Sequence, residues 1–182
     1  MADVKSGVSQ TAFVGLGELK IVRHEGILAC IGLGSCVGTL LYDVRTQTGV
    51  LAHVMLPDSS ICNDKDKLDG KYANTAVPAL LQTLADVGIS KSLLVAALIG
   101  GAELFKTVET PAALRIGARN VDKVSELLRA VGVPIVAREV GGSSGRSLYF
   151  NVATGKLEVK VCGMELRVHT LGMAGIAAAK AA

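Results

Sequence analysis

Short apolar runs, rich in β-branched residues and separated by polar or glycine-containing turns, recur along most of this chain. Runs of this kind are typical of buried or half-buried strands. The pattern predicts strands over Glu18–Arg23, Ile27–Ile31, Cys36–Tyr42, Val50–Leu56, Leu93–Ile99 and Pro134–Val140, and a hairpin of Leu148–Val152 with Leu157–Val161. For Cys36–Tyr42 a buried helix of the same length is an alternative. Asp43–Gly49 is expected to form a polar hairpin loop.

Two other segments have the spacing of amphipathic helices, with apolar residues every three or four positions. These residues are Val77, Leu80, Leu81 and Leu84 in the first segment, and Val124, Leu127, Leu128 and Val131 in the second. Asn74 and Asn120 precede the two patterns and are expected to be their N-caps. Pro78 would then lie in the first helical turn, where its missing N–H costs little.

Many strands with only two helices, and without regular alternation of the two, indicate an α+β fold with packed sheets. The length of 182 residues fits one domain. We expect that domain to span residues 15–166, after a frayed N-terminus of residues 1–14. The segment 167–182 is expected to be a flexible tail, rich in alanine and glycine from Leu171 on, with His169 at the surface.

Composition narrows the possible functions. Aromatic residues make up only 3% of the chain, and a net charge of +3 is not concentrated in a run of Lys or Arg, so nothing indicates nucleic-acid binding. The N-terminus lacks the apolar run of a signal peptide, and no stretch approaches the roughly 20 apolar residues of a membrane span. We therefore expect a cytoplasmic protein, not embedded in a membrane, with reduced thiols.

The strongest candidate chemistry is a cysteine after a glycine-rich turn, followed by a histidine on the next apolar strand. Cys36 closes the turn Gly32–Cys36, which can expose its sulfur and, around Gly34 and Ser35, aim backbone N–H groups at an oxyanion. His53 would be at least half buried and needs a polar partner, which Cys36 could supply. An imidazole there would lower the pKa of the thiol. The competing interpretation is a cysteine that only packs.

The other cysteines carry weaker signals. Cys30 lies on an apolar strand and is expected in the core, whereas Cys62 lies in a polar loop and Cys162 follows the last hairpin. No CxxC pair or zinc-ligand spacing is present, so we expect no metal site and no cofactor.

A second glycine-rich segment, Gly141–Arg146, contains Ser143, Ser144 and Arg146, which suit an anion. It lacks the Lys-Ser/Thr ending of a P-loop, and no helical pattern follows it. We interpret it as a substrate or partner loop, or simply a turn. The polar segment Asp58–Lys71 is a further candidate for substrate contact.

Six blocks of the sequence, taken together, resemble the CheD family of chemoreceptor glutamine deamidases. In order along the chain they are Gly32–Val37, His53–Pro57, Lys71–Asn74, Ile99–Ala102, Ile116–Asn120 and Gly141–Arg146. They cover roughly residues 15 to 161, and six ordered blocks are more specific than any one of them.

The resemblance implies a cytoplasmic chemotaxis protein that converts selected receptor glutamines to glutamate. It implies a β-sandwich flanked by helices, similar to the deamidase domain of cytotoxic necrotizing toxins. The nucleophile of the family falls on Cys36 and its general base on His53. The implied partners are the cytoplasmic helices of chemotaxis receptors and a CheC-type phosphatase.

One position departs from the family pattern, because Cys30 stands where the family typically has a threonine. A thiol is a weak hydrogen-bond partner for a histidine. Either a backbone carbonyl orients His53 instead, or this chain is a weaker deamidase. Two rival hypotheses follow: a CheD-like regulator that binds receptors or the phosphatase without catalysis, and a redox sensor that uses Cys30 and Cys36.

Overall fold

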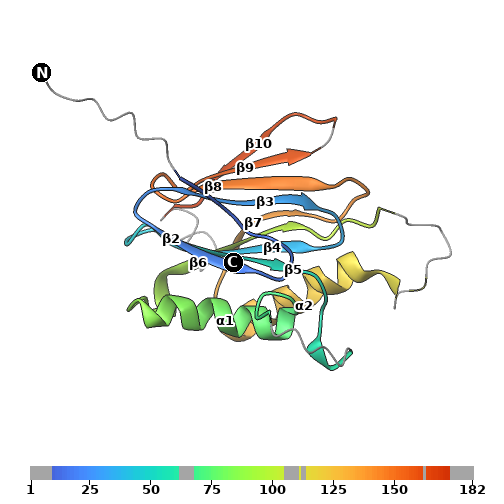
Figure 1. Ribbon diagram of the computed structural model, residues 1–182, viewed down its shortest axis with the longest axis horizontal. Helices are drawn as coiled ribbons and strands as arrows, with labels where there is room; N and C mark the ends of the chain where they lie inside the picture. Colours follow the sequence, from blue (N-terminus) through green and yellow to red (C-terminus); the bar gives the residue numbers. More distant parts are fainter. Residues whose placement is uncertain (1–9, 62–67, 105–110, 112–113, 162, 173–182) are drawn as a thin grey trace, which may run out of the picture.

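Two five-stranded sheets lie face to face, and two helices cover the outer side of one of them (Figure 1). The computed structural model describes residues 10–61, 68–104, 111, 114–161 and 163–172. This arrangement confirms the α+β, sandwich-based fold class, with both helices on the same side. No helix in these residues is long and apolar enough to cross a membrane.

Sheet A has the strand order β1-β3-β8-β9-β10, and sheet B has the order β2-β5-β4-β6-β7. The strands of sheet A are β1 (Thr11–Phe13), β3 (Ile27–Leu33), β8 (Arg146–Asn151), β9 (Lys156–Val161) and β10 (Arg167–Thr170). Those of sheet B are β2 (Leu19–Arg23), β4 (Val37–Asp43), β5 (Thr48–Val54), β6 (Leu94–Gly100) and β7 (Ile135–Val140). The pairs β1–β3 and β6–β7 are parallel, and the other pairs are antiparallel.

The helices are α1 (Ala73–Asp86) and α2 (Ile116–Ala130), with short 3-10 turns η1 (Ser59–Ile61) and η2 (Lys91–Leu93). Their apolar faces pack on the outer face of sheet B and form one core with it. A second core fills the space between the sheets, where the Tyr42 and Phe150 rings meet edge to face at 4.8 Å. The odd positions of β5 face one core and the even positions the other, as the two-residue period of a strand requires.

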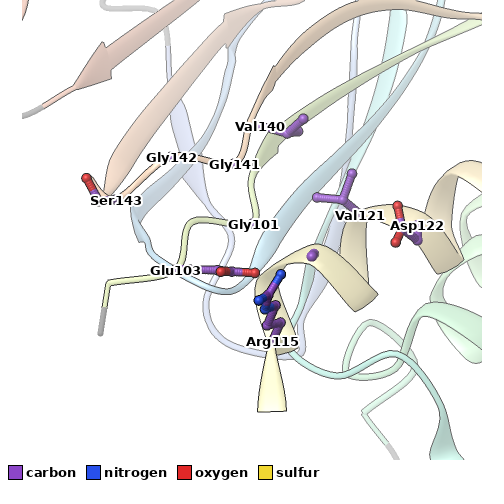
Figure 2. A pocket seen from close by; sticks show the side chains of 10 residues that line it. Gly101, Glu103, Arg115, Val121, Asp122, Val140, Gly141, Gly142 and Ser143 are labelled. Atoms are coloured by element: carbon purple, nitrogen blue, oxygen red, sulfur yellow. The ribbon is translucent and has the colours of Figure 1, made fainter. Parts of the chain in front are cut away.

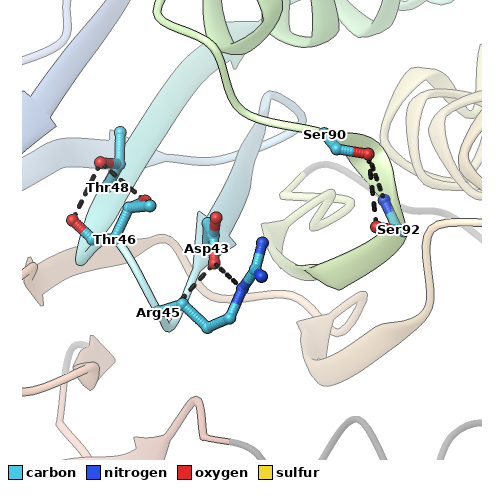
Figure 3. A network of polar contacts seen from close by, with 6 residues as sticks. All are labelled: Asp43, Arg45, Thr46, Thr48, Ser90 and Ser92. Atoms are coloured by element: carbon cyan, nitrogen blue, oxygen red, sulfur yellow. Dashed lines mark hydrogen bonds and ion pairs between the residues drawn. The ribbon is translucent and has the colours of Figure 1, made fainter.

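The hairpin between β4 and β5 fixes the register of the two strands that carry the candidate site. Asp43 accepts a hydrogen bond from the Arg45 N–H at 2.9 Å, and the hydroxyls of Thr46 and Thr48 lie 3.1 Å apart (Figure 3). Asp43 and Thr48 are themselves fully buried. Side-chain bonds of this kind favour a tight polar turn, as the sequence predicted.

Two segments that were expected to lie outside the domain, in the frayed N-terminus and in the tail, contain strands of sheet A. Thr11–Phe13 pairs with β3, and Arg167–Thr170 pairs with β9, so the sheet extends beyond the boundary expected at residue 166. His169 Nε2 lies 2.9 Å from a carboxylate oxygen of Glu139, and Leu171 is buried. These contacts anchor the start of the expected tail. Its residues 173–182 lie outside the described part of the chain.

Both helices begin before the asparagines that were expected to cap them, so neither Asn74 nor Asn120 is an N-cap. Asn74 instead accepts a hydrogen bond from the Ser59 N–H at 3.0 Å and donates to Asp58 at 3.2 Å. Pro78 consequently lies beyond the first turn of α1. The Asn74 side chain ties η1 to the helix, a tertiary contact that local spacing does not reveal.

Candidate active site

The strand register brings Cys36 and His53 to the same face of sheet B. Cys36 directly precedes β4, and on β4 Gly38 is paired with His53 of β5. Because side chains alternate along a strand, Cys36, two residues before Gly38, projects to the same face as His53. Cys36 is partly buried and packs against the core between the sheets. Cys36, directly before β4, thus lies diagonally from His53 on the neighbouring strand.

The His53 ring is held with one nitrogen engaged and the other free. Its side chain is buried, and Nδ1 lies 3.4 Å from the carbonyl oxygen of Val14. A carbonyl only accepts, so the hydrogen is on Nδ1 and Nε2 carries a lone pair. Nε2 is buried and has no hydrogen-bond partner among the described residues. Burial lowers the pKa of His53 below 6.5, so the ring is neutral at pH 7 and suited to accept a proton.

Cys30 lies beside this arrangement without contacting the ring nitrogens. Its Sγ donates to the same Val14 carbonyl at 3.5 Å. Burial raises the pKa of Cys30 to about 12, so it stays a thiol. Of the two alternatives that the sequence left open, the structure thus shows a backbone carbonyl at the orienting position of His53.

The pKa of the Cys36 thiol differs from the expectation. Burial raises its pKa above the usual 9.0, with a partial offset from its own backbone N–H. The expected lowering of the thiol pKa by His53 is therefore wrong for the free protein. At neutral pH both groups are uncharged, which means that the proton still has to move when a reaction begins.

The turn Gly34–Cys36, here named the cysteine turn, is anchored by its carbonyl groups. Its first carbonyl accepts from the Ala102 N–H at 2.7 Å, and its last accepts from the Gly101 N–H at 2.8 Å. Gly100 permits this close approach, because a Cβ there would lie 2.3 Å from the Cys36 oxygen. Gly100 also has a φ of +111°, a conformation that other residues rarely adopt. The backbone at the end of β6 thus holds the cysteine turn through two hydrogen bonds and one close packing contact.

Asn120 also anchors the cysteine turn, although the sequence pattern predicted it to be a helix N-cap. It lies within α2, is fully buried, and donates from Nδ2 to the Ser35 carbonyl at 3.0 Å and to the Met55 carbonyl at 2.9 Å. A usable signal was present, since Asn120 lies one helical turn before Val124 and shares its buried face. A polar residue on an apolar helical face indicates a specific partner inside the protein.

The segment Gly141–Arg146 contacts the end of β6, which in turn holds the cysteine turn. The Gly141 N–H donates to the Gly100 carbonyl at 3.0 Å, and Arg146 Nη1 donates to the same oxygen at 3.3 Å. Arg146 is the first residue of β8 and is buried, so its placement in a loop is wrong, whereas its contact with a substrate or partner stays a prediction.

Ser143, by contrast, is exposed and lines a cavity of about 580 Å³ between the N-terminal end of α2 and the loop before β8 (Figure 2). Glu103, Arg115 and Asp122 line the same cavity. Two carboxylates beside one guanidinium do not favour a phosphate. Ser144 is only partly exposed and does not line the cavity.

A second cavity, of about 390 Å³, opens onto His53. Its wall includes Phe13, Leu16 and Ile31, residues that are each more than half exposed. Three exposed large apolar side chains around a buried imidazole form an entrance of the kind that a substrate side chain and its neighbours can cover. Cys62 and Cys162 lie outside the described residues. Within those residues, no cluster of three or more His, Cys, Asp or Glu side chains could hold a metal ion.

Comparison with known proteins identifies the family of this chain. Residues 55–161 match the family described as CheD chemotactic sensory transduction. The chain belongs to the CheD family. It is 42% identical over 147 residues to the chemoreceptor glutamine deamidase CheD of Bacillus licheniformis, covering 81% of this chain and 88% of that protein. It is 41% identical over 159 residues to that of Bacillus subtilis, covering 87% and 92%, and 39% identical over 150 residues to that of Thermotoga maritima, covering 82% and 91%.

Proposed function

We propose that this protein hydrolyses the side-chain amide of specific glutamines on chemotaxis receptors to glutamate, with Cys36 as nucleophile and His53 as general base. One observation carries the proposal. The buried Nε2 of a neutral His53 has no hydrogen-bond partner among the described residues, on the face of sheet B to which Cys36 projects. The CheD relatives named as chemoreceptor glutamine deamidases supply the substrate class.

In the first half of the reaction Cys36 forms a thioester. The thiol proton passes to His53 Nε2 as Sγ attacks the carboxamide carbon of the glutamine. Backbone N–H groups around Ser35 and Cys36 stabilise the oxyanion, on a turn whose carbonyls are already engaged. The C–N bond then breaks, and the nitrogen takes the proton from Nε2 and leaves as ammonia.

In the second half, water releases the product. His53 accepts a proton from water as the water oxygen attacks the thioester carbon. The C–S bond breaks, Cys36 recovers its proton, and the glutamine has become a glutamate. The hydrogen bond from Nδ1 to Val14 keeps the ring in the same tautomer for both halves.

We assign the approach of the receptor to the cavity of about 390 Å³ at His53. A glutamine side chain would enter it, and the apolar residues that flank this glutamine on the receptor helix would cover Phe13, Leu16 and Ile31. Ser143 lines the larger cavity, whose lining residues differ from those of the cavity at His53. There we place contact with a partner such as a CheC-type phosphatase.

The alternative is a CheD-like regulator that binds receptors or the phosphatase but is catalytically weak or inactive. The observation that favours it is Cys30, which stands at the family threonine position and donates to Val14 rather than to His53. The two functions predict different chemistry on the same receptor fragment. A binding protein leaves every glutamine intact, whereas a deamidase raises the mass of the modified peptide by about 1 Da per site, because an amide becomes an acid.

The test is incubation of the protein with soluble cytoplasmic fragments of chemotaxis receptors, followed by peptide mass spectrometry. Conversion of a few defined glutamines, with others on the same helices unchanged, is the expected result. Binding of the fragment without any conversion over hours would favour the regulator and contradict the deamidase. A CheC-type phosphatase added to the same assay shows whether it competes for the receptor-binding face.

A further inference from the structure

One buried amide connects the two segments that carry the candidate catalytic pair. Asn120 Nδ2 donates to the carbonyl of Ser35, directly before Cys36, and to the carbonyl of Met55, two residues after His53. The two distances are 3.0 and 2.9 Å, both ordinary for N–H···O bonds. The bonds therefore join the cysteine turn to the end of β5 through a single side chain.

The chemistry of the amide fits this connecting position closely. An asparagine NH₂ has two donor hydrogens, and here each has a backbone carbonyl to bind. The opposite orientation of the amide would place Oδ1 against two carbonyl oxygens, so the assignment of nitrogen and oxygen follows from the contacts. Oδ1 is buried and has no partner among the described residues. A buried oxygen without a hydrogen-bond partner lowers the stability of the fold, and an apolar side chain would avoid that loss. The presence of an asparagine here therefore points to a role for its two donor hydrogens.

The helix that carries Asn120 is seated against the same support as the cysteine turn. At Gly117 an added Cβ would lie 2.6 Å from the carbonyl oxygens of both Gly101 and Ala102. The backbone N–H groups of Gly101 and Ala102 hold the cysteine turn. Asn120 thus reaches the turn from a helix packed directly on its anchor, so its position has little freedom.

We propose that Asn120 is a positioning residue, whose amide fixes the distance between the cysteine turn and the end of the His53 strand. The inference rests on the proposed roles of Cys36 and His53. Asn120 itself touches neither sulfur nor imidazole in the described contacts. It acts through the two carbonyls, and its loss lets the turn and the strand end move relative to each other.

The test compares Asn120→Ala and Asn120→Ser with the parent protein. Asn120→Ala removes both donors, and a displacement near 1 Å is expected to lower kcat on a receptor fragment by about 10- to 100-fold, with KM within about twofold. Asn120→Ser keeps one donor and should fall between. Iodoacetamide labelling of Cys36, followed peptide by peptide, should move the opposite way. A loosened turn exposes the Cys36 thiol, and the apparent pKa of this thiol falls toward the usual value. Labelling at pH 8 should therefore become about two- to fivefold faster.

Ser125→Ala is the matched control. Ser125 is also buried on α2. Its hydroxyl donates to the Val121 carbonyl at 2.6 Å and accepts from Arg138 Nη1 at 3.3 Å, so this variant too removes buried hydrogen bonds of α2. This variant should leave kcat and Cys36 labelling at parental values. Asn120 variants with a lowered melting temperature but parental kcat and labelling would overturn the positioning role. So would failure of both Asn120 variants to fold while Ser125→Ala folds, because the amide would then be purely structural.

The labelling measurement also separates this inference from the proposed function. If the parent protein converts no receptor glutamine, the deamidase proposal fails, yet a change in Cys36 labelling in Asn120→Ala would still show that the amide holds the cysteine turn. If the parent is an active deamidase and both readouts are unchanged in the variants, only the positioning role fails.

Discussion

Substitution of Gly100 by alanine tests whether the end of β6 sets the position of Cys36. The added Cβ would lie 2.3 Å from the Cys36 carbonyl oxygen and 3.1 Å from the Cβ of Leu33. The first neighbour is backbone, which cannot rotate away as a flexible side chain would. The Cys36 carbonyl and the segment it belongs to must therefore shift.

The size of the effect follows from these distances. Ordinary contact begins at 3.4 Å, so the Cys36 oxygen and residue 100 must separate by about 1.1 Å, which is 3.4 minus 2.3. The φ of +111° adds a backbone cost of roughly 1–3 kcal/mol in stability for a residue with a Cβ. A displacement near 1 Å at a reacting group costs on the order of 100-fold in rate. Gly100→Ala should therefore lose about two orders of magnitude in kcat/KM.

Gly88→Ala is the control, because it has the backbone cost without the collision. Gly88 follows α1, has a φ of +80°, and offers open space to a Cβ. The assay is the rate of glutamine conversion on one receptor fragment, with melting temperatures measured for both variants. We expect both to be destabilised and only Gly100→Ala to lose activity. Full activity in a folded Gly100→Ala protein would refute the idea that this contact positions the cysteine turn.

Two further predictions concern the pH dependence set by Cys36 and His53 and the role of Cys30. Burial lowers the pKa of His53 below 6.5 and raises that of Cys36 above 9.0, so the pH profile of kcat/KM should be a broad bell, with its acid limb below pH 6.5 and its basic limb above pH 9. An acid limb above pH 7 would contradict the neutral resting pair. Cys30→Thr should change kcat/KM by less than about threefold, because the Val14 carbonyl rather than residue 30 contacts Nδ1. An increase of tenfold or more, measured on the same fragment, would show that residue 30 orients the ring.

The strands and the fold class could be predicted from the sequence because burial imposes a period on each element. His53 is buried, as expected, and the segment predicted as Cys36–Tyr42 is a strand, β4 (Val37–Asp43), rather than a helix. Helix ends were predicted poorly. An asparagine before an apolar pattern is a common N-cap, but Asn74 and Asn120 both bind distant backbone or side chains. Such partners are set by tertiary structure and leave no local trace.

The candidate site divides in the same way. The residue types and spacing of Cys36 and His53 point to thiol chemistry from the sequence alone. The carbonyl of Val14 could not be predicted, since any residue supplies a carbonyl and its position depends on the path of the chain after β1. Arg146 was misinterpreted for a related reason. Its neighbours in sequence are glycines and serines, but its partner is the Gly100 carbonyl.

The most direct test of the account is glutamine conversion by Cys36→Ala beside the parent protein, on one receptor fragment and at equal concentration. Removing a partly buried thiol from the cysteine turn changes little packing, so the variant should fold with a melting temperature close to that of the parent. We predict that the mass gain of about 1 Da per modified glutamine, present with the parent, is absent with Cys36→Ala, because the variant lacks the thiol that is proposed to form the thioester. Conversion by a folded Cys36→Ala protein at a rate comparable to the parent would contradict the assignment of Cys36 as the nucleophile.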